Sequence, residues 1–380
     1  MAKSFSDIII LAGGSGERLW PASLPSHPKQ FIFFHQNLTL LQHAVIRALA
    51  LKPQGKIIIA GCQDILPGLI KQLKDLKTKV SIEEKEKLNK DLIIFTDPSH
   101  KNTAAPILAL SIILNKADLA EKKENEKRNV LMLTSDHVIY PLENFIKDCE
   151  KACYISSNDR FCFFGIEASE PSSEFGYIEY EDFFNQELNC HKITSFTQKP
   201  DKKDAENFIE KRNFLWNSGM LSFTPSLLLD EIKKNQIELW ESFKKLEKTT
   251  FKLKKEKGFF IIKNSLLLKK SYSSIKPISI EDILARNTDK EAVIKASFHW
   301  SDVGNWESFA KNYEKMCSSN TEHTVEIESC GNFIYSDIPV ALCGVENMII
   351  VVKNGKLLIM KKGKTSFIRK LVDKIKEKGL

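Results

Sequence analysis

The sequence predicts an α/β protein with a doubly wound sheet, followed by a small unit rich in β-strands. Short apolar runs alternate with helical stretches over about the first 300 residues. These runs are continuously apolar, which is typical of strands buried on both faces of a parallel sheet. From about residue 320 the chain changes to short strands separated by Gly and Asn-Gly turns. We therefore place a large domain at 1–315 and a small β-rich domain at 316–380.

The predicted elements of the large domain alternate regularly. Runs rich in Ile, Leu and Val predict strands at 6–14, 56–61, 90–97 and 129–139. Apolar residues at helical spacing predict helices at 40–51, 65–76 and 104–117. The C-terminal domain is expected to end in a basic helix at 366–379.

The charge balance argues against a nucleic-acid partner. The 380 residues include 56 Lys and Arg against 49 Asp and Glu, so the net charge is only +7. Arg is scarce in the three lysine-rich tracts, at 83–90, 121–129 and 244–257, whereas a nucleic-acid patch would interleave Arg and aromatic residues. We expect these tracts to be solvated helix faces or loops.

Neither a membrane span nor a secretory leader is expected. No stretch approaches the roughly 18 apolar residues that a span requires, and MAKSFSDIII fits a first strand better than a leader. The eight cysteines are scattered without a CxxC pair, and only Cys149 and Cys153 share a helical spacing. This usage favours buried free thiols over a structural zinc site and predicts a reducing compartment, so we expect a cytoplasmic protein.

The most informative stretch is the glycine-rich loop after the first strand, LAGGSGERLWPASLPSHPKQF (11–31). Gly13, Gly14 and Gly16 carry no Cβ, so positive φ is allowed and backbone N–H groups can approach an anion closely. Arg18 and Lys29 add positive charge at the carboxyl edge of the sheet, where open α/β folds bind ligands. The loop matches neither GxxxxGK[ST] nor GxGxxG. We interpret it as a polyphosphate cradle, and the alternative is a purely structural turn.

A polar cluster ends the apolar run at 129–139. Ser135, Asp136 and His137 follow this strand, which places them at the same predicted sheet edge as the glycine loop. Mg²⁺ typically takes one or two carboxylates together with substrate phosphates, so Asp136 is a candidate ligand. A structural cap is the alternative role for Asp136, and His137 is expected to make a polar contact without a catalytic role.

The whole glycine loop closely resembles the nucleotide-binding signature of the sugar-1-phosphate nucleotidyltransferases. It is most similar to LAGGxGxRLWPxSxxxxPKQF of the mannose-1-phosphate guanylyltransferases. The resemblance implies a Rossmann-like, GT-A-type mixed sheet. It also implies that the nucleotide is bound by Leu11, Ala12, Gly13, Gly14, Gly16 and Arg18.

Three further segments resemble motifs of the reaction centre in this family. NTAAP (102–106) is similar to RNTAPA, with Lys101 in place of the family Arg, and implies that Asn102 helps to seat the base. LTSDHVI (133–139) is similar to PSDHxI and implies nucleotide contacts from Ser135 and Asp136. FHWSDVGNWESF (298–309) is similar to WxDVGxW and implies that Asp302 is the second carboxylate on the metal. The resemblance therefore assigns catalysis to Arg18, Lys29, Asp136 and Asp302, with Mg²⁺ as the expected ion and Mn²⁺ as the alternative.

Four more segments resemble the sugar-contacting motifs of the family. They are SEFGYIEY (173–180), FTQKPD (196–201), FLWNSGMLSF (214–223) and SIEDIL (279–284). By resemblance they imply sugar contacts from Gly176, Gln198, Lys199, Asn217 and Glu281. Three positions depart from the family: Gln198 replaces a Glu, Glu281 replaces an Asp, and Arg286 stands where the family has its closing Glu.

The resemblance implies transfer of GMP from GTP to α-D-mannose 1-phosphate, with release of pyrophosphate. It also implies a homodimer. Two alternatives stay open: the same chemistry with another sugar 1-phosphate or nucleotide, and a non-catalytic regulatory subunit that senses nucleotide sugars. The resemblance ends near residue 362, so we expect no second, isomerase activity. A metal-dependent glycosyltransferase is disfavoured because no DxD motif is present, and an oxidoreductase because the dinucleotide fingerprint fails.

Overall fold

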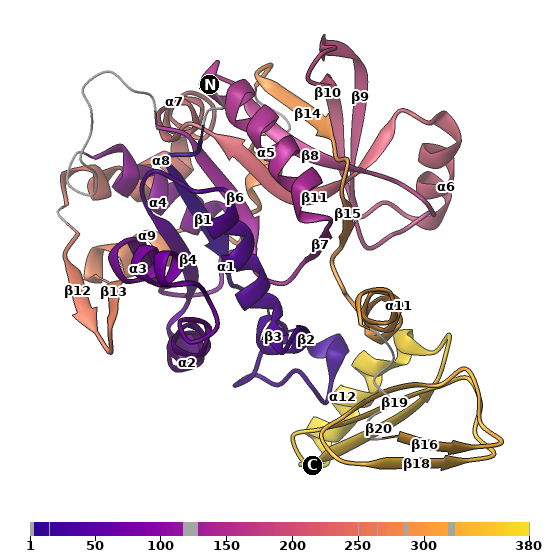
Figure 1. Ribbon diagram of the computed structural model, residues 1–380. Coiled ribbons are helices and arrows are strands. Elements are labelled where there is room, and N and C mark those ends of the chain that lie inside the picture. Colours follow the sequence, from indigo (N-terminus) through magenta and orange to yellow (C-terminus); the bar gives the residue numbers. More distant parts are fainter. Residues whose placement is uncertain are drawn as a thin grey trace.

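The computed structural model describes residues 4–14, 16–116, 128–249, 251–263, 265–284, 288–317 and 324–379. Within these residues the large domain is built on an eleven-stranded sheet in the order β12-β13-β5-β4-β1-β6-β11-β8-β14-β10-β9 (Figure 1). In this order the strands are β12 Leu253–Glu256, β13 Phe259–Ile262, β5 Leu92–Asp97, β4 Ile57–Cys62, β1 Asp7–Leu11, β6 Val130–Thr134, β11 Phe214–Phe223, β8 Phe161–Glu167, β14 Glu291–Lys295, β10 Cys190–Gln198 and β9 Gly176–Asn185.

The centre of the sheet confirms the predicted doubly wound arrangement. Strands β5, β4, β1 and β6 are parallel neighbours. Successive side chains of a strand point to opposite faces. Ile8 and Ile10 accordingly join the apolar cluster of one face, whereas Ile9 joins that of the other. One face is covered by α1 Leu40–Ala50, α2 Leu66–Leu76 and α5 Leu142–Ser157, and the other by α4 Ala104–Asn115, α7 Pro225–Asn235, α8 Ile237–Phe243, α9 Leu266–Ser273 and α10 Ile280–Leu284.

The other half of the sheet is mixed. Strand β11 is antiparallel to β6 and β8, and β14 is parallel to β8. The single strand predicted at 129–139 is wrong, because the chain turns at Ser135 and Asp136. It forms β6 and then β7 Val138–Tyr140, which pairs outside the main sheet with β15 His299–Ser301. This pairing brings the segment after Ser301 next to the segment before Val138.

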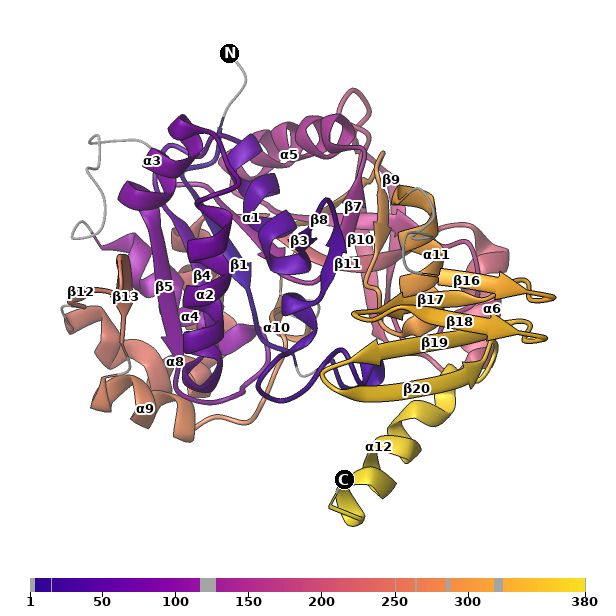
Figure 2. The same cartoon turned by 60° about the horizontal axis from the view of Figure 1, so that its bottom comes forward.

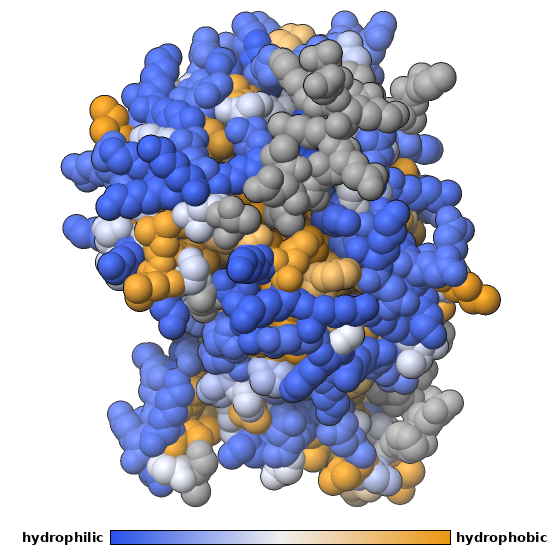
Figure 3. Space-filling view, turned by 90° about the vertical axis from the view of Figure 1, so that its left-hand side faces the viewer, coloured by the Kyte–Doolittle hydropathy of each residue, from blue (hydrophilic) through white to orange (hydrophobic). Residues whose placement is uncertain are grey.

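The lysine-rich tract at 244–257 forms a short 3₁₀ helix, Lys244–Lys248, and the edge strand β12. The exposed Lys254 and Lys255 on β12 discourage edge-to-edge pairing with another sheet. The tract at 83–90 lies on α3 Ile82–Asp91 and is largely exposed, as predicted, whereas most of the tract at 121–129 lies outside the described residues. Figure 3 shows the side of the molecule with α3, α9 and β12, where hydrophilic side chains predominate around a hydrophobic band.

The C-terminal unit lies to one side of the large domain (Figure 2). Its strands pair in parallel, β16 with β18 and β17 with β19, and β20 closes a hairpin with β19 through Asn354 and Gly355. One apolar cluster joins this unit to α11 and to residues Leu19, Ala22 and Phe34 of the large domain. The elements are α11 Trp306–Met316, β16 Thr324–Ile327, β17 Phe333–Ser336, β18 Val340–Cys343, β19 Met348–Lys353, β20 Lys356–Lys361 and α12 Ile368–Glu377.

Shorter elements complete the chain. They are the 3₁₀ helices η1 Glu17–Leu19, η2 Lys29–Phe31, η3 Gln63–Ile65 and η6 Thr365–Phe367, the small hairpin of β2 Phe33–His35 and β3 Leu38–Thr39, and α6 Lys202–Lys211. Among the described residues, no helix combines the length and apolar character needed to cross a membrane. Five cysteines are buried free thiols, including Cys149 and Cys153.

Candidate functional site

A cavity of about 290 Å³ opens at the carboxyl ends of β1, β4, β5 and β6. The Ser135 N–H donates to the Leu11 carbonyl at 3.0 Å, and the Ala12 N–H donates to the Ala60 carbonyl at 2.7 Å, so adjacent strands hold the loops at this edge. Six of the predicted nucleotide-binding residues line the cavity: Leu11, Gly13, Gly14, Asn102, Ser135 and Asp136. The sequence analysis missed other residues of its wall, among them Gln30, Cys62, Asp97, His100 and Thr103.

The three glycines of the loop play two different roles. Gly16 has φ of 62°, and a Cβ there would lie 2.3 Å from the Cβ of Lys29, so both the backbone and the space require glycine. Gly13 and Gly14 do not use the positive φ that glycine allows. A Cβ at either would meet nothing within 4 Å, because both residues border open space. At these two positions the absence of a side chain therefore keeps the cavity open.

Lys29 brings the two predicted metal ligands together. Its buried ammonium lies 2.8 Å from the Asp136 carboxylate and also donates to the backbone carbonyl of Asp302. Burial opposes ionisation of Asp136, but Lys29 and His137 outweigh it and hold the pKa of this carboxyl below its ordinary value. The three residues are distant in sequence, so only the fold, through the β7–β15 pair, creates this contact.

Asp302 and Arg18 meet at Gly304. A Cβ on Gly304 would lie 2.7 Å from the Asp302 Oδ2 and 3.0 Å from an Arg18 Nη, so glycine leaves room for both groups. Burial raises the pKa of Asp302, and the nearby Asp136 and Glu174 carboxylates raise it further. The positive charges of Lys29 and Arg18 lower this pKa but do not cancel the rise. Arg18 also pairs with Glu174, a partner that the sequence analysis did not find. We call Arg18, Lys29, Asp136 and Asp302 the charged wall.

The charged wall fits a divalent cation. Lys29 contacts the Asp136 carboxylate and the backbone carbonyl of Asp302, and the Asp302 carboxyl group is close enough to be affected by the charges of both residues. Hard cations such as Mg²⁺ take carboxylate and phosphate oxygens, and Asp136 lines the open cavity. Burial raises the pKa of Asp302, and a cation bound beside it would favour the ionised form of this carboxyl group.

His137 and Lys101 are held by the fold. Burial lowers the pKa of His137 to about 4, and its Nδ1 accepts a hydrogen bond of 3.0 Å from the Trp300 indole. The ring is therefore neutral near pH 7, in keeping with a polar contact. The Lys101 ammonium donates to the Ile275 carbonyl at 2.6 Å, which ties the cavity loop to a distant segment.

A second group of predicted residues gathers on β9, β10, β11 and α10. Gly176 pairs with Gln198 across the β9–β10 ladder, and a Cβ on Gly176 would lie 3.0 Å from the Gln198 Oε1 and 3.6 Å from the Asn217 Cβ. The Asn217 amide donates to Glu281 at 3.3 Å, and the hydroxyl of Thr103 from the cavity wall lies 3.5 Å from the same carboxyl group. We call Gly176, Gln198, Asn217 and Glu281 the amide wall.

Lys199, a predicted sugar-binding residue, does not join the amide wall. Its side chain is exposed, and its backbone N–H donates to the Phe175 carbonyl at 3.2 Å. Arg286 lies outside the described residues. In the wall itself, burial raises the pKa of Glu281, although the Asn217 amide favours its ionised form.

A second cavity, of about 420 Å³, lies on the outer side of the glycine loop. Gly13, Gly14 and Glu17 form one part of its lining, and Ile375 and Lys376 of α12 form another. Lys376 makes an ion pair of 2.8 Å with Glu17. The basic terminal helix is thus present as predicted, but the sequence analysis gave no sign that it packs beside the glycine loop.

Comparison with known proteins identifies the class that this fold and site define. Residues 7–319 match the family model described as nucleotidyl transferase, so the chain belongs to the nucleotidyl transferase family. Residues 322–375 match a MannoseP isomerase/GMP-like beta-helix domain, which agrees with the parallel pairing of β16 with β18 and β17 with β19.

Individual relatives show which proteins within this family the chain resembles. Mannose-1-phosphate guanylyltransferase RfbM of Salmonella typhimurium is 30% identical over 372 residues, which cover 97% of this chain and 72% of that protein. Alginate biosynthesis protein AlgA of Pseudomonas putida is 28% identical over 377 residues, which cover 98% and 72%. A solved structure from Thermus thermophilus, described as a mannose-1-phosphate geranyltransferase, has a TM-score of 0.76 at 20% identity and covers 98% of this chain and 100% of that one. The family resemblance and the fold class predicted from the sequence are confirmed.

Proposed function

We propose that this protein transfers GMP from GTP to α-D-mannose 1-phosphate and releases pyrophosphate, giving GDP-mannose for polysaccharide synthesis. The observation that carries the proposal is the contact of Lys29 with both Asp136 and Asp302 beside the glycine-loop cavity. The names of the relatives that are 26–30% identical support the choice of nucleotide and sugar.

The charged wall would act by alignment and neutralisation. Backbone N–H groups of Gly13 and Gly14, with Lys29 and Arg18, would hold the triphosphate of GTP. Asp136 and Asp302 would hold Mg²⁺, with Mn²⁺ as the alternative, and the bound ion would neutralise charge on the phosphate that reacts.

No general base is needed for the transfer. The attacking oxygen belongs to the phosphate of the sugar phosphate and is already an anion, so the protein needs to position it opposite the pyrophosphate leaving group. The neutral, hydrogen-bonded His137 is consistent with this scheme, because no proton has to be removed.

The amide wall would hold the sugar. The Asn217 amide and the Glu281 carboxyl group offer donors and acceptors to sugar hydroxyls, and the Gln198 carbonyl lies over Gly176, where no side chain obstructs a ring. We further propose that the protein acts in the cytoplasm as a homodimer.

A second candidate function is the same transfer with another sugar 1-phosphate or nucleotide. Two observations favour keeping it. Gln198 is neutral where the family has a carboxylate, and Lys101 is bonded to the Ile275 carbonyl where the family has an Arg. A regulatory subunit that only senses nucleotide sugars is less consistent with a complete charged wall.

The test is pyrophosphate release by the purified protein with Mg²⁺, GTP and mannose 1-phosphate, with ATP, UTP and glucose 1-phosphate as alternative substrates. Release with the GTP and mannose pair alone is the expected result. Release with another pair would support the same transfer reaction with a different sugar phosphate or nucleotide as substrate. No release with any pair, while GDP-mannose still binds, would overturn the proposal in favour of the regulatory subunit.

A further inference from the structure

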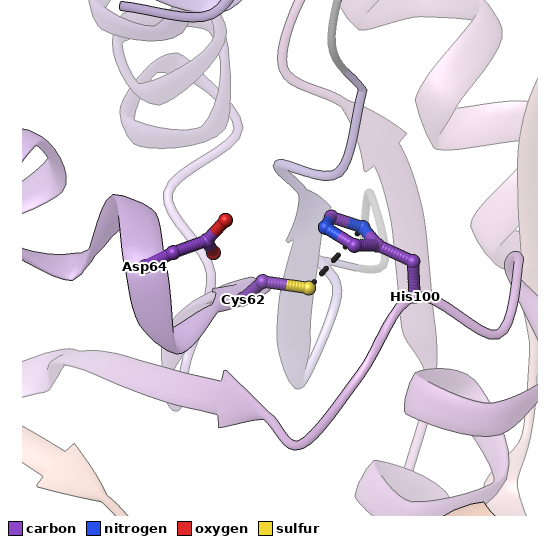
Figure 4. Close-up of side chains that lie close together, drawn as sticks. All are labelled: Cys62, Asp64 and His100. Atoms are coloured by element: carbon purple, nitrogen blue, oxygen red, sulfur yellow. Dashed lines mark hydrogen bonds between the residues drawn. The ribbon is translucent and has the colours of Figure 1, made fainter. Parts of the chain in front are cut away.

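Cys62, Asp64 and His100 lie together where the two cavities meet. Figure 4 shows their side chains, which come from the end of β4, from η3 and from the loop after β5. One potential ligand atom from each residue lies within 4.8 Å of the other two, and the Cys62 Sγ is 3.3 Å from the His100 Nδ1. His100 lines both cavities. Cys62 lines the cavity of about 290 Å³ beside the glycine loop, and Asp64 lines the outer cavity. The proposed transfer reaction uses none of these three side chains.

The three groups have the chemistry of a site for a borderline-soft cation. Thiolate, imidazole and carboxylate are the ligands that Zn²⁺ takes in proteins, and a site with three protein ligands leaves a fourth position open. Zn–S bonds of about 2.3 Å and Zn–N bonds of about 2.0–2.1 Å place the ligand atoms of one tetrahedral ion roughly 3.5 Å apart. The Cys62–His100 separation of 3.3 Å is close to this value. The Asp64 oxygen lies within 4.8 Å of both, and the exposed side chains of Asp64 and His100 can move to close the remaining distance.

The surroundings of the cluster attract a cation. Asp97 ends β5 opposite Cys62 on the neighbouring strand, and Asp64 lies in the cluster itself, so two carboxyl groups flank the thiol. Burial raises the pKa of Asp97 to about 7, and a nearby cation would favour its ionised form. Asp97 is itself buried and accepts a hydrogen bond of 2.5 Å from the Tyr272 hydroxyl. A cation bound at Cys62 would therefore lie near two carboxyl groups. Asp64 would be a ligand, and Asp97 would lie beside Cys62 on the neighbouring strand.

We propose that Cys62, Asp64 and His100 bind one Zn²⁺-like divalent cation, with its open position directed to the junction of the two cavities. The Cys62 thiol gives up its proton to solvent when the ion binds. The site is separate from Asp136 and Asp302, whose oxygen ligands suit a harder ion. It also joins the chain after β4 to the chain after β5, so the ion cross-links two loops beside the glycine loop.

The experiment uses Co²⁺ as a spectroscopic probe and Zn²⁺ as its competitor, with the full chain and without nucleotide. Cys330 and Cys343 are exposed thiols that could bind metal adventitiously, so both are first replaced by Ser. We expect one equivalent of Co²⁺ with a thiolate-to-metal absorption band and tetrahedral d–d bands, displaced by Zn²⁺ but not by Mg²⁺. This readout does not depend on turnover, so the metal site can be confirmed or rejected whether or not the protein has the proposed transferase activity.

Single substitutions in this background assign the ligands. Cys62→Ser should abolish the thiolate band. Loss of a group that only hydrogen-bonds to a metal ligand already weakens metal binding about 10–100-fold, so Asp64→Asn and His100→Gln should each weaken it at least as much. Asp64 is exposed, so its replacement tests the site without disturbing the core, and Asp204→Asn on the exposed face of α6 is the matched control. A protein that binds no Co²⁺, or whose binding is unchanged by Asp64→Asn and Cys62→Ser, would overturn the proposal.

Discussion

The charged wall and the amide wall lie at the same edge of one sheet, but they are held in different ways. In the charged wall, Lys29 reaches Asp136 across 107 positions of the chain and also contacts Asp302. In the amide wall, the β9–β10 ladder sets Gly176 beside Gln198, and a neutral amide of Asn217 contacts Glu281. Charges stabilise phosphate groups wherever their charge develops, whereas neutral donors and acceptors discriminate by direction. For the proposed transfer we therefore expect the rate to depend on the charged wall and the choice of sugar to depend on the amide wall.

The largest effect is expected from breaking the charged wall at Asp136. Asp136→Asn removes the charge of a proposed metal ligand and leaves Lys29 bonded to the Asp302 carbonyl. We expect turnover to fall by at least about a hundredfold, as for other groups that stabilise a transition state electrostatically. The measurement is the initial rate of pyrophosphate release, with circular dichroism to verify folding. Wild-type turnover in a folded Asp136→Asn protein would contradict the role of this wall.

A smaller and more selective effect is expected from the amide wall. Asn217→Ala removes a donor that would face the sugar and that also contacts Glu281. The lost hydrogen bonds should raise KM for the sugar phosphate by about tenfold, which corresponds to about 1.4 kcal/mol. The KM for the nucleotide should stay the same. An equal rise in both KM values would show that the two walls do not divide the substrates as proposed.

Gln198→Glu is expected to change activity less than Asn217→Ala does, and it tests which sugar the amide wall accepts. The substitution restores the carboxylate of the family at a side chain whose carbonyl lies over Gly176. If the sugar is mannose, activity should stay the same or rise by a few fold. The measurement is kcat/KM with mannose 1-phosphate and with glucose 1-phosphate. A sharp loss with mannose 1-phosphate, together with retained binding of GTP, would indicate a different sugar.

The smallest effect on turnover is expected at Glu291, which begins β14 opposite Phe161 of β8 and belongs to neither wall. Burial raises the pKa of its carboxyl group from 4.5 to about 8. The folded protein therefore holds a proton that the unfolded chain releases, so stability is highest below the unfolded pKa and falls as the pH rises towards 8.

Glu291→Gln should remove this part of the pH dependence. Wild-type protein should lose at most about 1.4 kcal/mol of unfolding free energy per pH unit between about pH 5 and pH 8, and the variant should lack that slope. Urea unfolding across this range measures both curves. Parallel curves for the two proteins would show that Glu291 does not hold its proton in the folded state.

The sequence was sufficient to predict the centre of the fold. Residues 8–11, 57–62 and 92–95 carry no polar side chain because both faces of their strands are covered, and this pattern is local. The break after Thr134 was missed because Val138 and Ile139 continue the apolar run although they belong to another sheet. The apolar pattern of the sequence indicates only which residues are buried. Two consecutive buried strands therefore give the same pattern as one long strand.

The candidate site was predictable only in part. The resemblance located Asp136 and Asp302, but their common contact with Lys29 depends on tertiary structure. Glu174 could not be singled out as the partner of Arg18, because it is one exposed acid among 49 acidic residues and lies 156 positions away. Likewise, Cys62 and His100 do not share a ligand spacing, since their loops meet only through the pairing of β4 with β5.

The ion pair between Glu17 and Lys376 has a consequence for how the protein is made. These residues are 359 positions apart, yet both border the outer cavity beside the glycine loop. Because domains form in order from the N-terminus during synthesis, the glycine loop emerges early and the helix beside it emerges much later. The outer cavity therefore cannot be complete until α12 has left the ribosome, so a nascent chain lacks this wall however well its sheet has already folded.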